Sequence, residues 1–282
     1  MTSAQAVSRS QRVIVIEPAS KRFDFNAREL WEYRELLYFL IWRDLKVRYK
    51  QTALGVGWAV IQPVVAMVIF SLIFGRFAKL PSEGLPYPVF VYAGLLPWNY
   101  FAASLSGASG SIVGNTNLIT KVFFPRLLIP LGSVATPAVD FFIALLVLVG
   151  LMFGYGISPD WHLVFLPFFL LMALLTSLGI GLWLATVNVR YRDVPYVIPF
   201  MTQIWMYASP IIYPVTLLPS KWQWVLSLNP LTGVIEGFRW SLLGQQRPAL
   251  LVLLVSAGVG VALTVSGLAY FRRVERGFAD IL

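Results

Sequence analysis

Six hydrophobic stretches, each long enough to cross a lipid bilayer, limit what this chain of 282 residues can fold into. A helical span needs about 20 apolar residues to cross about 30 Å of hydrocarbon. These runs are continuous rather than alternating, and lipid cannot satisfy open sheet edges, so helices are predicted and a β-barrel is excluded. The spans cover approximately residues 55–75, 89–113, 127–158, 161–189, 194–217 and 248–271. The sequence therefore predicts an all-α integral membrane protein.

The distribution of charge gives the orientation of these spans. With the N-terminus inside, six spans return the C-terminus inside, and 17 of the 22 Lys and Arg residues fall on one side. Cytoplasmic loops retain Lys and Arg, so that side is predicted to be cytoplasmic. The net charge of +9 then reflects this bias and attraction to anionic lipid, and no nucleic-acid partner is expected.

The segment before the first span divides into two parts. Residues 1–27 are polar and unpatterned, and are expected to form a flexible cytoplasmic tail without the apolar core of a cleavable signal peptide. From residue 28 a single amphipathic interface helix is predicted, within a segment 28–52, lying along the membrane surface. One helical face carries Arg28, Glu32, Glu35, Arg43, Lys46 and Lys50, opposite Leu30, Tyr33, Leu37, Leu40 and Ile41. This helix is either a lipid anchor or an anchor that also docks a soluble partner.

Two connections are more than simple loops. On the inside, residues 115–130 form a short amphipathic stretch broken at Pro125. On the outside, residues 219–247 contain two predicted helix starts, a capping box from Ser220 to Gln223 and the pair Asn229–Pro230. Each of the two helices is too short and too polar to span the membrane, so the pair is expected to lie in the outer interface or to form a re-entrant hairpin. Glu236 and Arg239 are expected to form a local ion pair within it.

Signatures of catalytic chemistry are missing. The sequence has no phosphate-binding P-loop, no metalloprotease or hydrolase motif and no cysteine, and its single histidine, His162, is expected at headgroup level. No catalytic, cofactor-binding or metal-binding residue is therefore predicted. Asp140 is the one acid clearly inside a span, where a structural hydrogen-bonding or pore-lining role is favoured over proton relay.

Aromatic and small residues leave several interpretations open. Most of the 42 aromatic residues fit interfacial belts, although some could line a conduit and stack on sugar rings. Small residues repeat every four positions, which supports tight bundling or dimerisation equally. These repeats are Ser106, Gly110 and Gly114 on the second span, and Gly150 and Gly154 on the third.

Three segments in order resemble the permease subunits of ABC transporters that export polysaccharides such as O-antigen, capsule or teichoic acid. They are LIWRDLKVRYKQTALGVGWAVIQP at 40–63, KVFFPRLLIP at 121–130 and LNPLTGVIEGFRWSLLG at 228–244. The resemblance covers residues 28–282 and implies a single transmembrane permease domain in the bacterial inner membrane. It also implies a homodimer that pairs with two copies of a separate ATPase, which would bind ATP and Mg²⁺ and drive export of a lipid-linked polysaccharide.

The resemblance assigns roles to the three regions. The interface helix would contact the ATPase through Arg43, Lys46, Arg48 and Lys50. Residues 115–130 would form a coupling or gate helix and contact the ATPase through Lys121, Phe124, Pro125 and Arg126. Residues 219–247 would form an outer gate hairpin containing Trp222, Trp224, Asn229, Pro230, Glu236 and Arg239. Trp98, Tyr100 and Phe101, after Pro97, are the expected conduit aromatics.

Two other classes of protein remain open from the sequence. One is an ABC permease for a drug or small lipid, which would share this fold. The other is a membrane-embedded glycosyl- or phosphotransferase, which would require acidic or histidine residues gathered near one membrane face, whereas those present are scattered.

Overall fold

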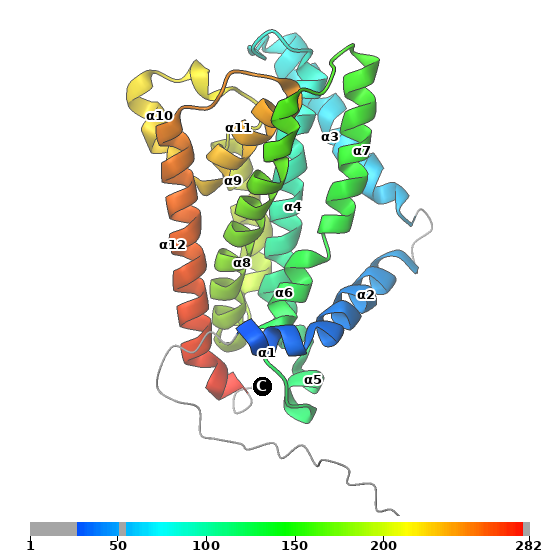
Figure 1. Ribbon diagram of the computed structural model, residues 1–282, viewed down its shortest axis with the longest axis vertical. Coiled ribbons are helices and arrows are strands. Elements are labelled where there is room, and N and C mark those ends of the chain that lie inside the picture. The colour runs from blue at the N-terminus through cyan, green and yellow to red at the C-terminus, as the bar shows by residue number, and fades with distance from the viewer. Residues whose placement is uncertain (1–26, 51–54, 279–282) are drawn as a thin grey trace, which may run out of the picture.

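The computed structural model describes residues 27–50 and 55–278, and within them every regular element is helical (Figure 1). Residues 1–26, most of the predicted tail, lie outside the described residues, as do residues 51 and 52 of the predicted interface segment. The α-helices are α1 Ala27–Glu32, α2 Arg34–Lys50, α3 Gly57–Phe70, α4 Tyr87–Gly114, α5 Thr116–Lys121, α6 Leu128–Ala135, α7 Ala138–Gly154, α8 Leu166–Arg190, α9 Val194–Ala208, α10 Ser220–Ser227, α11 Pro230–Leu243 and α12 Leu250–Val274.

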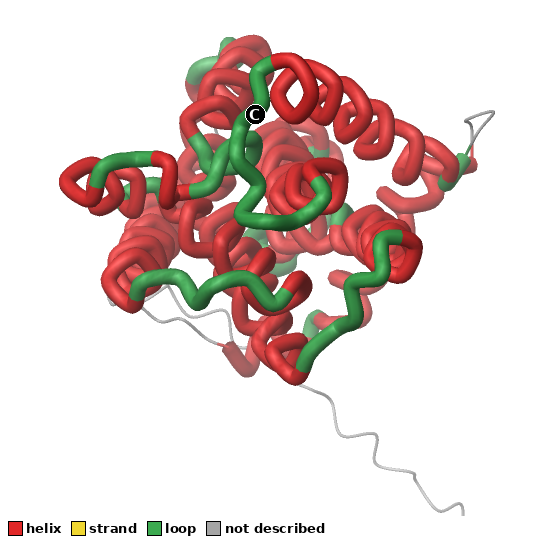
Figure 2. Tube along the Cα trace, turned by 90° about the horizontal axis from the view of Figure 1, so that it is seen from above, coloured by secondary structure: helices red, strands yellow, loops and turns green. Residues whose placement is uncertain are grey.

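Helix α4 forms the centre of the bundle. It packs against α3, α6, α7, α8, α9 and α11, and most of its residues from Val89 to Ile112 are buried. Seen from above, several long helices are viewed nearly end-on around the middle of the molecule (Figure 2). The second predicted span therefore exists as one continuous helix, and Pro97 lies inside it without ending it.

Within residues 27–50 and 55–278, four helices are long and apolar enough to cross a membrane: Gly57–Phe77, Leu128–Gly154, Trp161–Arg190 and Leu250–Val274. The first continues from α3 into a π-helical turn, Ser71–Phe77. These match the first, third, fourth and sixth predicted spans. The fifth predicted span, 194–217, is not one helix, because α9 ends at Ala208 and is followed by irregular chain and a short 3₁₀ turn, Val215–Leu217. The 15 residues of α9 extend only about 22 Å.

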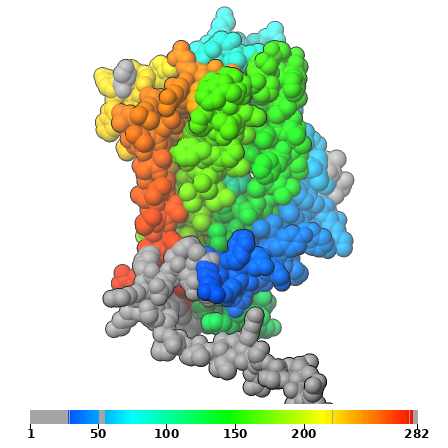
Figure 3. All heavy atoms as spheres, in the orientation of Figure 1, coloured from blue at the N-terminus to red at the C-terminus, as the bar shows by residue number. Residues whose placement is uncertain are grey.

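The segment predicted as an interface helix forms two consecutive helices. The helix is interrupted at Tyr33, between α1 and α2. At the interruption the Arg34 guanidinium donates to the carbonyl oxygen of Trp31 at 3.2 Å, which gives that carbonyl a partner. The expected apolar face is real, since Leu37, Leu40 and Ile41 surround Gly132 of α6. In the space-filling view α1 and α2 lie on the surface at the lower end of the molecule (Figure 3).

Helices α8 and α12 approach each other backbone to backbone at two glycines. A Cβ atom on Gly267 would lie 2.2 Å from the carbonyl oxygen of Gly179, and one on Gly179 would lie 2.6 Å from the backbone of Thr264. Gly110, Gly114, Gly150 and Gly154, which form small-residue repeats in the sequence, would meet nothing within 4 Å. Close packing within the chain thus depends on a different pair of glycines.

We expect Gly267→Ala to destabilise the protein by about 1–3 kcal/mol, because the added methyl group forces α8 and α12 apart. The control is Gly258→Ala on the same helix, where a Cβ meets nothing within 4 Å. Thermal unfolding in detergent, followed by size-exclusion chromatography, should show a lower midpoint for Gly267→Ala alone. Equal midpoints for the two variants would contradict this packing.

Candidate coupling surface and outer gate

The two predicted functional regions lie at opposite ends of the bundle. Helices α1 and α5 and the C-terminal end of α12 lie at the lower end in Figure 1, whereas α10, α11 and the start of α12 lie at the upper end. Most of the described cations predicted to be cytoplasmic belong to the lower end, and the predicted outer hairpin forms the upper end. The division of charge along the sequence therefore corresponds to a division in space.

At the lower end, part of the predicted coupling segment is anchored to the C-terminal turn Glu275–Gly277. The Arg126 guanidinium donates to the carbonyl oxygen of Glu275. Phe124 is 5% exposed and belongs to one apolar cluster with Phe271 and Phe278, whose rings pack edge to face. Pro125 is buried beside them. These three predicted coupling residues thus fasten the segment to the bundle rather than face solution.

The longest exposed run of the same segment ends with Lys121–Phe123. Phe123 is 87% exposed, and Val122 beside it is also exposed. Helix α5 ends at Lys121 and Val122 is extended, so Phe123 and Phe124 point to opposite sides. Sequence analysis missed Phe123, because the position where α5 ends decides whether Phe123 or Phe124 faces outward, and that position is not evident from the sequence.

The predicted cations of α2 have different surroundings. Arg43 pairs with Asp44 at 2.8 Å, Lys50 is exposed at the end of the helix, and the Lys46 ammonium lies 3.3 Å from the centre of the Trp42 ring. Arg48 instead turns into the protein, where its guanidinium donates to one oxygen of Asp140. The Tyr49 hydroxyl donates to the other oxygen. Asp140 therefore has the structural hydrogen-bonding role considered for it, as the link between α2 and α7.

At the upper end, the predicted pair of helices is present but its members differ in burial. Helix α10 exposes Trp222 and Trp224, whereas every residue of α11 except Glu236 is buried, against α4, α8 and α12. The predicted capping box stays a prediction, because it depends on the side chain of Ser220, which lies outside the described part of the structure. Helix α10 is preceded by Pro219, and Gln223 donates to the carbonyl oxygen of Leu218.

The predicted cap at Asn229–Pro230 is confirmed, and it does more than begin α11. The side-chain oxygen of Asn229 accepts from the backbone N–H of Leu231 and from the indole N–H of Trp205, both at 3.0 Å. Its amide nitrogen donates to the Ser209 hydroxyl at 2.8 Å. Pro230 is the buried first residue of the helix. Asn229 thus joins α11 to the end of α9.

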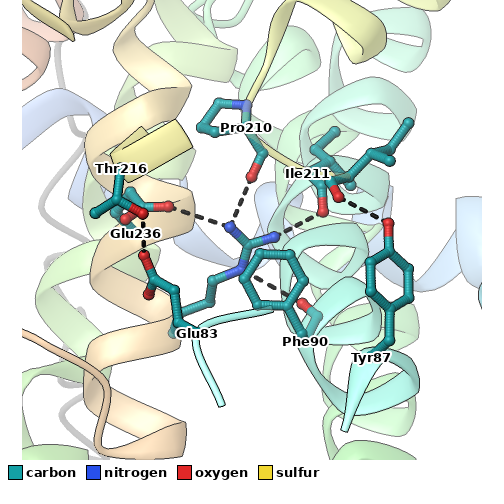
Figure 4. Close-up of polar contacts among 9 residues, drawn as sticks. Glu83, Tyr87, Phe90, Pro210, Ile211, Thr216 and Glu236 are labelled. Carbon is teal, nitrogen blue, oxygen red and sulfur yellow. Dashed lines mark hydrogen bonds and ion pairs between the residues drawn. The ribbon is translucent and has the colours of Figure 1, made fainter. Parts of the chain in front are cut away.

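Arg239 is fully buried, at 0% exposure, and makes the densest set of polar contacts in this region (Figure 4). Its guanidinium donates to the carbonyl oxygens of Pro210 at 2.7 Å, Ile211 at 2.6 Å and Phe90 at 3.3 Å. It also pairs with Glu236 at 3.1 Å and lies over the Phe90 ring. The expected local ion pair exists, but it is buried and connects three segments of the chain.

The Glu236 carboxyl is influenced by more than Arg239. Burial raises the pKa of Glu236, the Arg239 guanidinium opposes that rise, and the charge of Glu83 adds to it. Glu83 itself accepts a hydrogen bond from the Thr216 hydroxyl at 2.7 Å, and the Tyr87 hydroxyl donates to the carbonyl oxygen of Ile212 (Figure 4). The chain before α4 is therefore joined to the chain after α9 on both sides of Arg239.

The predicted conduit aromatics lie in the core of the single chain. Trp98, Tyr100 and Phe101 are all buried, and the Tyr100 hydroxyl donates to the carbonyl oxygen of Val134. Phe101 packs edge to face on Trp205. Their assignment to a conduit stays a prediction. The packing of Trp98 and Phe101 lends it no support, whereas Tyr100 also lines a cavity between α2, α3, α4 and α7.

A different row of aromatic side chains is exposed. On α9, Tyr196 is 83% exposed, and Phe200 and Tyr207 are exposed on the same side of the helix, with Ile204 between them. Their spacing of four and seven residues is helical. Periodicity within residues 194–208 could have identified this row, but the whole segment was treated as one span.

Comparison with known proteins agrees with the arrangement of these regions. Residues 35–243 match the family of ABC-2 type transporters. The chain belongs to this family. It is 31% identical over 256 residues to the O-antigen export system permease protein RfbA of Myxococcus xanthus, covering 90% of this chain and 97% of that one. A protein of the same name from Klebsiella pneumoniae is 31% identical over 250 residues, covering 88% and 95%.

The polysialic acid transport protein KpsM of Escherichia coli is more distant, 26% identical over 204 residues, covering 70% of this chain and 77% of that protein. The resemblance seen in three segments is thus confirmed at the level of the family. This is a family of transporter subunits rather than enzymes, and among the described residues no group of histidine and acidic side chains could hold a metal ion.

We expect Arg239→Met to destabilise the protein by about 3–5 kcal/mol, because it leaves the buried Glu236 and three carbonyl oxygens without their partner. Arg247→Ala, at an exposed arginine near the same end, should change stability by less than about 0.5 kcal/mol. Thermal unfolding of the purified variants compares them. An Arg239→Met variant as stable as the wild type would show that the guanidinium contacts contribute little.

Proposed function

We propose that this chain is the permease subunit of an ATP-driven exporter that moves a lipid-linked polysaccharide, such as O-antigen, out of the cytoplasm. The observation that carries the proposal is near full-length similarity to two proteins named O-antigen export permeases. A permease for a smaller substrate is the second candidate, favoured by 28% identity to the inner membrane transport permease YadH of Escherichia coli. That similarity covers only 65% of this chain.

The proposed assembly contains two copies of this chain and two copies of a separate ATPase in the bacterial inner membrane. The absence of a P-loop supports a separate energy source, so ATP and Mg²⁺ would bind to the partner. Six crossings, with both termini cytoplasmic, would include α4 and the shorter α9 together with the four long apolar helices. Burial of α11 among α4, α8 and α12 supports a re-entrant hairpin at the outer end.

The function is tested by deleting the gene and analysing the glycans that remain. Loss of a surface polysaccharide, with its lipid-linked precursor accumulating in the cytoplasm, is expected, together with co-purification of an ATPase subunit with the tagged permease. Unchanged glycans with altered drug or lipid content would favour the second candidate.

We propose that Phe123 and Val122 are the apolar centre of the surface that docks the ATPase, with Lys121 beside them, and that the α2 cations Arg43, Lys46 and Lys50 contact the same partner from a separate helix. Exposed apolar side chains within a polar rim are characteristic of protein interfaces. Phe124, Pro125 and Arg126 hold this surface in place from behind.

Phe123→Ala should reduce co-purification of the ATPase about tenfold or more while leaving the permease as stable as the wild type, because the removed ring is exposed and adds little to the core. Phe124→Ala is the matched variant, and it should instead destabilise the permease by about 3–5 kcal/mol. The ratio of the two subunits on a gel and the thermal midpoint of the permease separate the effects. Normal assembly of the Phe123→Ala variant would refute the docking role.

We propose further that the exposed row on α9 faces the glycan path. Aromatic surfaces suit the apolar faces of sugar rings, while the hydroxyl groups of a glycan cost several kcal/mol each if stripped bare in hydrocarbon. A polar or hydrated path with aromatic walls satisfies both requirements.

Replacing Tyr196 and Phe200 together by alanine should lower polysaccharide export several-fold at an unchanged protein level, because both side chains are exposed and contribute little to the core. Leu146→Ala, at an exposed position on α7, is the control. Quantified surface polysaccharide is the measurement. If export instead falls with Trp98→Ala and Tyr100→Ala in stable protein, the conduit lies at the positions first predicted.

A further inference from the structure

A cavity of about 440 Å³ lies between α2, α3, α4 and α7. Its volume falls within the range of about 300–1,000 Å³ typical of small-ligand sites. The walls include Pro63, Leu96 and Phe141, so the floor is largely apolar. Neither the coupling surface nor the outer gate contains this cavity.

The polar groups of the cavity come from four helices. Arg48 of α2 and Asp140 of α7 form the ion pair already described, and Gln62 of α3 and Asn99 of α4 add two carboxamides. An arginine has five N–H donors and a carboxylate about four acceptor positions, so the pair retains hydrogen-bonding capacity. The lining therefore offers both donors and acceptors to a ligand.

Charge and shape together select the class of ligand. Arg48 and Asp140 are the charged residues of the lining and they cancel, so the site offers no excess charge to a phosphate or an ammonium group. Trp58 of α3 is 52% exposed and also lines the cavity. A neutral ligand with many hydroxyls and an apolar ring face uses mixed donors and acceptors beside an aromatic surface.

We propose that this cavity binds a neutral sugar unit of the transported glycan, with Trp58 against the ring face and Arg48, Asn99 and Asp140 hydrogen-bonded to its hydroxyls. This inference rests on the proposed function, since it names a subsite for the glycan of that exporter. Because Arg48 belongs to α2, a ligand in the cavity would contact the same helix that carries Lys46 and Lys50 on its exposed face.

The lack of cysteine in the sequence allows a direct test on the full-length protein in lipid nanodiscs. Gln62→Cys places a single thiol in the cavity, and Thr120→Cys on exposed α5 is the control. Labelling of each thiol by a water-soluble maleimide is timed with and without methyl hexopyranosides or methyl N-acetylhexosaminides. Inorganic phosphate and glycerophosphoethanolamine are the competing probes.

At least one of the glycosides should slow labelling at position 62 by about threefold or more and leave position 120 unchanged. Adding Trp58→Ala should weaken that protection roughly tenfold, and Trp58→Phe should restore most of it. Trp58 is half exposed, so neither variant removes a core residue. Protection by phosphate or glycerophosphoethanolamine but not by glycosides would overturn the proposal, as would glycoside protection that is independent of Trp58.

The test also separates this inference from the function on which it rests. Binding is measured without ATPase, ATP or transport. If the gene deletion abolishes polysaccharide export but no glycoside protects position 62, the cavity proposal fails and the function stands. If glycosides protect position 62 but the deletion leaves all glycans unchanged, the exporter proposal fails.

Discussion

The buried guanidinium of Arg239 is the constraint on which the outer half of the structure depends. A charge with 0% exposure is costly unless it is paired and hydrogen-bonded, and here Glu236 and three carbonyl oxygens meet that demand. Those carbonyls belong to α4 and to the irregular chain after α9, which has no helical hydrogen bonds of its own at residues 210 and 211. Non-helical backbone is tolerated at membrane depth when protein groups satisfy it. Helix α9 ends where Ser209, in an extended conformation, precedes Pro210, and Arg239 of the buried α11 then binds the carbonyl oxygens of Pro210 and Ile211.

The inner end is held together differently, mainly by apolar contacts. Leu40 of α2, Phe124 beyond α5 and Phe278 near the C-terminus belong to one buried cluster, separate from the larger core around α4 and α11. Helices α4 and α8 run the length of the bundle, and each contributes residues to both clusters. The smaller cluster therefore connects α2, the segment around Phe124 and the end of α12 to the two long central helices.

The fold was largely predictable because hydrophobic length and charge bias act locally. The four long apolar helices, the cap at Asn229 and the apolar face of α2 all follow from residues near one another in the sequence. The end of α9 also has a local signal, Pro210, which the treatment of 194–217 as one span overlooked. The burial of Arg239 and the position of Phe124 instead depend on partners distant along the chain, 28 to 149 residues away for the carbonyl oxygens that Arg239 contacts. The family could be recognised from three segments of sequence. Which side of each segment faces outward could not be predicted, because packing against the rest of the bundle decides that orientation.

The interface helix shows how packing changes a prediction from periodicity alone. At about 100° per residue, α2 has three faces rather than two. Leu37, Leu40 and Ile41 are covered by α6, so they are not available to lipid, and the cations Arg43, Lys46 and Lys50 form a second face.

Between those two faces of α2, Tyr38 and Trp42 form an exposed aromatic strip, and the Lys46 ammonium lies over the Trp42 ring. Aromatic side chains with neighbouring cations are typical of the level of lipid headgroups. Of the two interpretations, a lipid anchor and an anchor that also docks a partner, this geometry favours the second. Under the proposed function, the aromatic strip would contact lipid, and the separate charged face of α2 would contact the ATPase.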